Sequence, residues 1–89
     1  IITSNRESGF GRYDVLMEPK NGTDNAVIME FKVKDSEEGT LKETAEAALE
    51  QIEERKYGTV LESRGIAPER IRKYGFAFEG KEVLIKSKE

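Results

Sequence analysis

Two carboxylates and a lysine lie in apolar stretches of this chain, where charged groups are unfavourable. Asp14 interrupts the apolar run at 12–18, and Glu30 and Lys32 lie in the β-branched run at 26–34. Side chains two residues apart in a strand share a face, so Glu30 and Lys32 are expected to project together. Burying a charge is costly unless a partner compensates it. The pattern therefore indicates either a salt-bridge network or a bound cation.

These residue types could bind a divalent cation. Asp14 and Glu30, joined by the main-chain carbonyl of Phe31, could hold Mg²⁺ or Mn²⁺ with positions left for water. Such a cation would neutralise a phosphodiester oxygen and acidify a water, while Lys32 could orient that water and stabilise the developing charge. The alternative is that the same three side chains form only cross-strand ion pairs.

Composition excludes several other chemistries. The chain has 89 residues with no cysteine and no histidine, so disulfides, thiolate ligands and imidazole catalysis are absent. The segment 75–81 has the glycine and lysine spacing of a phosphate loop, but Glu82 replaces the required serine or threonine, and a β-hairpin is the better interpretation. No membrane-spanning run or signal peptide is visible, which favours a cytoplasmic protein.

Charge is distributed unevenly along the chain. Residues 35–54 contain eight acids and one lysine, a local net charge of −7, which leaves +4 on the remainder of a chain whose total is −3. An acidic helix beside a basic sheet is compatible with a polyanionic partner that approaches from one direction. The charge distribution does not require such a partner.

Three strands and a helix are expected in the first two thirds of the chain. Strands at 1–5, 12–18 and 26–34 are separated by turn-forming residues and predict an antiparallel meander. On the assumption that the faces of the second and third strands match, the meander brings Asp14 and Glu30 to one end of the sheet. From Thr40, an N-cap candidate, apolar residues recur at helical spacing through Leu41, Ala45, Ala48, Leu49 and Ile52.

The last third of the chain predicts two further strands. Gly58 is expected to interrupt the helix, with Val60 and Leu61 in a short turn, and residues 68–70 to form one helical turn. Strands at 71–78 and 83–85 flank a hairpin turn at 79–82, with the aromatic residues of the first of them on one face. The order β-β-β-α-β-β predicts an α/β (α+β) fold with a mixed sheet of about five strands and one main helix.

No predicted helix covers the second face of the sheet. Residues 1–89 are expected to form a single domain, and the opening on the strand-like Ile1-Ile2-Thr3 without a methionine indicates a piece of a longer protein. The cover would then be a helix on the N-terminal side that is missing here, or a second copy of the chain in a homodimer.

Longer stretches around the charged residues resemble a known family. An Asp followed by Glu-x-Lys on successive strands, and then a helix, is similar to the PD-(D/E)XK nuclease superfamily with its restriction-endonuclease-like core. More closely, residues 4–14, 30–33 and 74–81 resemble the nuclease-like C-terminal domain of bacterial AAA-ATPase-like proteins. The resemblance covers nearly the whole chain and implies a Mg²⁺- or Mn²⁺-dependent nuclease acting on DNA, with an ATPase domain in the same parent chain.

Carried over by position, the resemblance assigns roles to five residues. It implies Asp14 and Glu30 as metal ligands, Phe31 as a carbonyl ligand, Lys32 as the catalytic lysine, and Gln51 as the helical glutamine of RecB-type members. In those members a tyrosine follows the glutamine by four residues. Here that place is Arg55, and Tyr57 comes six residues after Gln51.

Two alternatives to a nuclease remain open. The family carries its first-motif acid on a helix before the meander, which this chain lacks, and Glu7 or Glu18 are the substitutes available. Without that acid, the domain could be a catalytically inactive module that binds nucleic acid or a protein partner. A third interpretation is a sheet-and-helix interaction domain in which the charges only form ion pairs.

Overall fold

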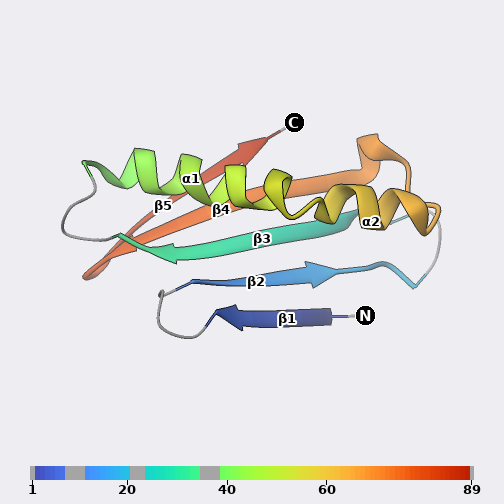
Figure 1. The fold of residues 1–89 in the computed structure, drawn as a ribbon, viewed down its shortest axis with the longest axis horizontal. Helices are drawn as coiled ribbons and strands as arrows, with labels where there is room; N and C mark the ends of the chain where they lie inside the picture. The colour runs from blue at the N-terminus through green and yellow to red at the C-terminus, as the bar shows by residue number, and fades with distance from the viewer. Residues whose placement is uncertain (1, 8–11, 21–23, 35–38, 89) are drawn as a thin grey trace.

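The computed structural model describes residues 2–7, 12–20, 24–34 and 39–88, with the backbone alone for residues 3–7 and 12–13 (Figure 1). Its elements, in chain order, are β1 (Ile2–Glu7), β2 (Arg12–Met17), β3 (Ala26–Val33), α1 (Leu41–Glu54), α2 (Tyr57–Ser63), a 3₁₀ turn (Pro68–Arg70), β4 (Ile71–Glu79) and β5 (Glu82–Lys88). The predicted strands, the main helix and the turn before β4 are confirmed. Helix α2 replaces the short turn that was expected around Val60 and Leu61.

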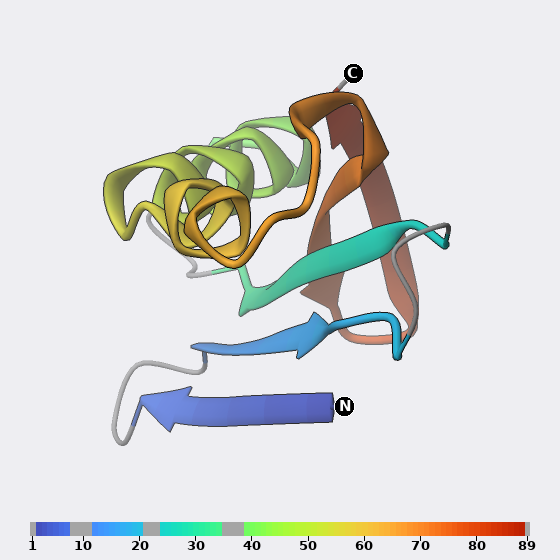
Figure 2. The ribbon, with the colours of Figure 1, turned by 90° about the vertical axis from the view of Figure 1, so that its right-hand side faces the viewer.

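The five strands form one sheet in the order β1-β2-β3-β4-β5. The pairs β1–β2, β2–β3 and β4–β5 are antiparallel, and β3–β4 is parallel. A parallel pair needs a crossover connection, which α1 and α2 supply. Figure 2 shows both helices on the same side of the twisted sheet. The predicted mixed α+β architecture is therefore confirmed, and it is consistent with a restriction-endonuclease-like fold.

Helix α1 begins where its cap residue predicts. The Thr40 side chain accepts a hydrogen bond from the backbone N–H of Glu43 at 3.1 Å, which satisfies one of the donors left free at a helix N-terminus. The helix buries a narrow stripe of small and apolar side chains: Thr44, Ala45, Ala48 and Ile52. Small residues let α1 lie close to the sheet.

Helix α1 lies close to the sheet at Gly75 of β4. A Cβ atom at this position would lie 2.5 Å from the carbonyl oxygen of Ala45 and 3.1 Å from Cγ of Leu49. Only glycine fits this contact without a shift of the helix. Because Gly75 is paired with Glu30 on β3, the contact places α1 beside the row of residues that contains Glu30.

The core lies between the helices and one face of the sheet. Its buried members come from three strands and both helices: Leu16, Ala26, Ile28, Ile52, Leu61 and Ile71. Burial of such side chains from water is the main stabilising contribution in a domain of this size. Asp14 and Glu30 lie in the same layer as this apolar cluster, which is unusual for carboxylates.

The opposite face of the sheet carries an aromatic cluster. Phe31 stacks on Phe76 with ring centroids 4.6 Å apart, and Phe78 lies 6.1 Å from Phe31. Exposed apolar residues of the chain include Ile2, Met17, Val33, Val83 and Ile85. Strand alternation places these residues with the aromatic cluster, and in the described ranges no helix covers this face (Figure 2).

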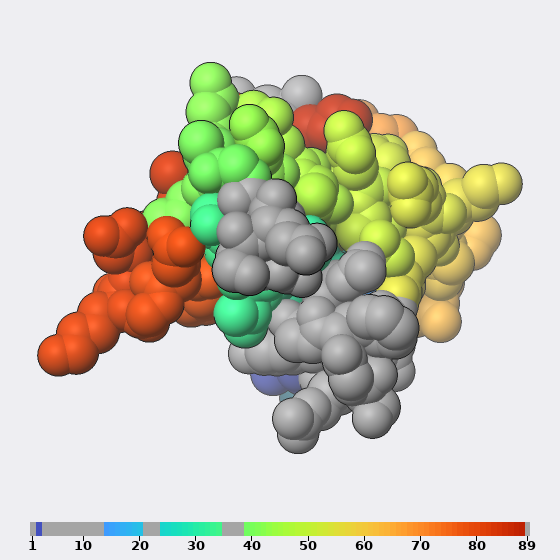
Figure 3. Space-filling view, turned by 60° about the vertical axis from the view of Figure 1, so that its left-hand side comes forward, coloured from blue at the N-terminus to red at the C-terminus, as the bar shows by residue number. Residues whose placement is uncertain are grey.

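Two local predictions are refined by the structure. Gly58 does not interrupt the helix: the break falls at Lys56, whose φ of 57° is left-handed, and Gly58 lies buried inside α2. The predicted β4–β5 hairpin is confirmed, because Glu79 pairs with Glu82 and Gly80 has a φ of 59°. In the space-filling view the turn of this hairpin projects beyond α1 (Figure 3).

Candidate metal-binding site

Asp14 and Glu30 face each other directly across β2 and β3. They are Cα partners in the antiparallel register, and each side chain is 1% exposed. Directly opposed residues share a face, with Cβ atoms typically about 5 Å apart. The predicted meeting of the two carboxylates is confirmed. Its position is not: the pair lies within the length of both strands and not at an end of the sheet.

The Asp14 carboxylate is held from one side by residues that follow α1. Its Oδ2 accepts a hydrogen bond from the Tyr57 hydroxyl at 2.6 Å and lies 3.4 Å from Nη1 of Arg55. The same Arg55 nitrogen lies 3.3 Å from the Tyr57 hydroxyl oxygen. Arg55 and Tyr57 therefore cover Asp14 and supply one cation and one hydrogen-bond donor.

Two oxygens of the carboxylate pair are buried and accept no hydrogen bond from the described residues: Oδ1 of Asp14 and Oε2 of Glu30. Glu30 as a whole does have an interaction partner. Buried polar atoms are normally satisfied, and exceptions call for an explanation such as an ion. Hard carboxylate oxygens side by side are the donors that Mg²⁺ and Mn²⁺ prefer, so these residues fit a divalent cation.

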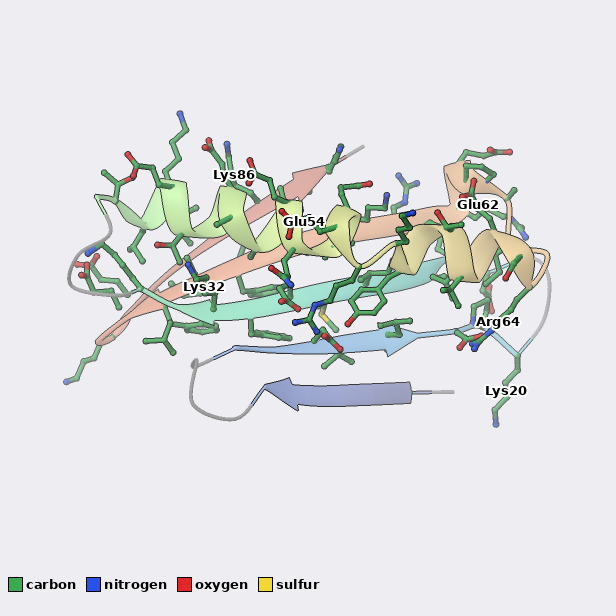
Figure 4. The ribbon with its side chains drawn as sticks, viewed as in Figure 1. Lys20, Lys32, Glu54, Glu62, Arg64 and Lys86 are labelled. Atoms are coloured by element: carbon green, nitrogen blue, oxygen red, sulfur yellow. The ribbon has the colours of Figure 1, made fainter. Side chains whose placement is uncertain are left out.

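The other predicted site residues take different positions. Lys32 follows Glu30 by two residues on β3 and shares its face, and it is half-buried (Figure 4). The Phe31 ring stacks on Phe76 on the opposite face, so only its main chain can face the pair. Gln51 is half-buried on α1, one turn before Arg55, whose backbone N–H donates to the Gln51 carbonyl at 3.0 Å.

Among the described side chains, no third acid lies beside Asp14 and Glu30. Glu18 lies four residues beyond Asp14, about 13 Å along an extended chain, and it pairs with Arg64. The Glu7 side chain lies outside what the structure describes. Within that part of the chain, no group of three or more Asp, Glu, His or Cys residues is placed to hold a metal ion.

Tyr57 is a donor at neutral pH. Burial, and then the hydrogen bond to Asp14, raise the pKa of the Tyr57 hydroxyl above its ordinary value. The protonated form therefore persists through the physiological range and can donate to Oδ2. Sequence reasoning did not assign Tyr57 to the site. The one signal was its position six residues after Gln51, where a tyrosine four residues on would have matched the pattern.

The class of protein follows from a comparison with models of protein families. The model of the PD-(D/E)XK nuclease superfamily matches residues 1–88 of the chain. The chain therefore belongs to the PD-(D/E)XK nuclease superfamily. Comparison with curated proteins and with solved structures returns no significant match. Membership indicates nuclease activity in general, and nucleases of this superfamily typically depend on a divalent metal.

The helices were also compared with the length and hydropathy of membrane-spanning helices. None of those in the described ranges has the length and hydropathy to span a bilayer.

Proposed function

We propose that this domain is a metal-dependent nuclease that hydrolyses phosphodiester bonds in DNA, with Mg²⁺ or Mn²⁺ held by Asp14 and Glu30. The observation that carries the proposal is the direct pairing of the two buried carboxylates, in which Oδ1 of Asp14 accepts no hydrogen bond from the part of the chain that the structure describes. Two facing carboxylates repel each other, and a divalent cation between them removes the repulsion. The family typically uses such an ion, which supports the same assignment.

The ligands proposed for the cation are the carboxylates of Asp14 and Glu30 and the main-chain carbonyl of Phe31. When bound, the cation supplies Lewis-acid neutralisation of a phosphodiester oxygen and lowers the pKa of a water. Lys32 shares the face of Glu30, so its ammonium group is proposed to hold the attacking water and to stabilise negative charge that develops on the phosphoryl oxygens. The side-chain amide of Gln51 is proposed to contact the phosphate backbone.

The charges around the site favour a polyanionic substrate more than the net charge of the chain does. Arg55 keeps 27% of its side chain exposed beside Asp14, and Lys32 is half-buried. Two glutamates of the acidic helix are already paired with lysines of the sheet, since Glu46 binds Lys86 at 2.8 Å and Glu53 binds Lys73 at 2.7 Å. These pairs reduce the repulsion that α1 exerts on a nucleic acid.

The proposed context is an ATPase domain in the same bacterial parent chain. It rests on the resemblance of residues 4–14, 30–33 and 74–81 to the C-terminal domain of AAA-ATPase-like proteins. The parent polypeptide should bind ATP in a filter or calorimetric assay. A parent polypeptide without ATP binding would contradict this context and leave the nuclease assignment of the domain intact.

The experiment that tests the function is cleavage of supercoiled and linear DNA in the presence of Mg²⁺ or Mn²⁺, with the native chain and Lys32→Ala. Loss of one charge-stabilising donor typically costs about 10²–10³ in rate, so Lys32→Ala should be slower by that order. Lys20→Ala is the matched control, because Lys20 is exposed and lies at the other end of the sheet from Lys32 (Figure 4). Equal rates for both variants would contradict the role of Lys32.

A second candidate function is a module that binds nucleic acid without cleaving it. The favouring observation is that the described side chains bring only two carboxylates together, with no third acid. In that case DNA would bind in a gel-shift assay, and neither Mg²⁺ nor Mn²⁺ would produce cleavage by the native chain. Cleavage that EDTA abolishes would exclude this candidate.

A further inference from the structure

The two oxygens of Asp14 have different surroundings. Oδ2 accepts the short hydrogen bond from the Tyr57 hydroxyl, at 2.6 Å, and faces Arg55 at 3.4 Å. Oδ1 is buried and accepts no hydrogen bond from the described residues. One oxygen is thus fixed by the protein, and the other is left with its lone pairs unused. This is the arrangement expected of a carboxylate that binds an ion through one oxygen while a neighbouring group sets its orientation.

A local break in the helix places Tyr57 at Asp14. In a continuous α-helix, residues advance by about 100° each, so Tyr57 would project about 240° around the axis from Gln51, away from Arg55. Helix α1 instead ends at Glu54, and Lys56 adopts a left-handed φ of 57° and a ψ of 35° before α2 begins. The break turns the chain so that the Tyr57 hydroxyl lies 3.3 Å from Nη1 of Arg55.

We propose that Tyr57 is a positioning residue for Asp14: its hydroxyl fixes Oδ2 and thereby presents Oδ1 to the divalent cation. The proposal rests on the proposed function, because it takes Asp14 as a metal ligand. Tyr57 itself does not contact the cation or the substrate. The left-handed conformation at Lys56 is part of this arrangement, because it brings Tyr57 to Asp14, which a regular helix would not do. A non-glycine residue in this conformation costs free energy, and such strain often accompanies functional sites.

The test is a Mn²⁺ titration by calorimetry on the native chain, Tyr57→Phe and Tyr74→Phe. Tyr57→Phe keeps the ring and removes only the hydroxyl, and loss of such an outer contact to a ligand typically weakens metal binding about 10–100-fold. Tyr74→Phe is the matched control, because Tyr74 lies on the opposite face of the sheet, with Phe76 and Phe78, and its variant should bind as the native chain does. Unchanged Mn²⁺ affinity in Tyr57→Phe would overturn the proposal.

Two further measurements separate positioning from mere structural support. Cleavage by Tyr57→Phe should fall at low Mn²⁺ and recover towards the native rate at saturating Mn²⁺, which loss of folding would not produce. Asp14→Asn should lose Mn²⁺ binding altogether. If the native chain and Asp14→Asn bind Mn²⁺ equally, or the native chain binds none, the proposed function fails together with the role of Tyr57. If Asp14→Asn loses binding and Tyr57→Phe does not, only the role of Tyr57 fails.

Discussion

Asp14 of β2 and Glu30 of β3 are direct cross-strand partners, and both carboxylates are buried in the layer that the helices cover. Two like charges in this position are unfavourable unless a cation is near. Arg55 supplies part of the compensation at 3.4 Å from Asp14, and Oδ1, which accepts no hydrogen bond from the described residues, is the basis for the proposed divalent cation.

Replacing Glu30 by glutamine should stabilise the chain in the absence of metal. The change keeps the size of the side chain and removes one of two facing negative charges, an effect of about 0.2–1 kcal/mol for a cross-strand pair. Urea unfolding in EDTA measures the effect, and added Mn²⁺ should then stabilise the native chain but not the variant. Lower stability of Glu30→Gln in EDTA would show that the carboxylates are already compensated.

Replacing Arg55 by methionine should destabilise the metal-free chain by about 1.5–3 kcal/mol, the usual value of a hydrogen bond to a charged group. The reason is that Asp14 loses its nearby cation while Glu30 stays opposite it. Because a divalent cation would replace the missing charge, saturating Mn²⁺ should raise the melting temperature of this variant more than that of the native chain. An equal rise in melting temperature in both proteins would show that Arg55 does not compensate the charge of the carboxylate pair.

Gly75→Ala should destabilise the fold by about 1–3 kcal/mol, the cost of inserting an extra methyl group into a packed contact. The new Cβ would lie 2.5 Å from the Ala45 carbonyl oxygen, which is main chain and cannot rotate away. Helix α1 would have to move off β4. Thermal unfolding compares this variant with Ser87→Ala on the exposed part of β5, which should unfold as the native chain does. Equal melting temperatures would mean that α1 is not held at Gly75.

Stability should fall in acid partly through Glu53. The hydrogen bond from Lys73 lowers the pKa of the Glu53 carboxyl below its ordinary value. A carboxyl with a lowered folded-state pKa contributes stability above its unfolded pKa, and the contribution is lost as pH falls through the folded value. Unfolding free energies measured from pH 7 to pH 3 should therefore decline less in Glu53→Gln. The side chain is 42% exposed, so solvent screening keeps the effect small, and 1 M salt should reduce it further.

Much of the architecture was predictable because its signals are local and periodic. The alternation in β3 placed Glu30 and Lys32 on one face of the strand, and Thr40 marked the start of α1. The match between the faces of Asp14 and Glu30 was an assumption, and the register of β2 on β3 confirms it. A shift of one residue would turn the apolar residues of these strands away from the core. The apolar face carrying Phe31 was likewise expected, since one main helix cannot cover both faces of a sheet.

The end of α1 could not be predicted from the sequence, and for this reason Tyr57 was not assigned to the site. Gly58 was the residue expected to break the helix, but it lies buried inside α2, where a Cβ would meet the flexible end of the Lys73 side chain at 3.2 Å. The break falls at Lys56, a residue type with no preference for left-handed backbone. The hydrogen bond from Tyr57 to Asp14 is a tertiary contact that accompanies this conformation, and periodicity along the sequence does not predict such contacts.

The most direct test of the account is a Mn²⁺ titration by calorimetry on the native chain, Asp14→Asn and Glu30→Gln. The account predicts saturable binding to the native chain and its loss in both variants, because both carboxylates hold the same cation. Saturable binding that survives in either variant would contradict the shared site. Absence of binding by the native chain would contradict the assignment of a metal to this carboxylate pair.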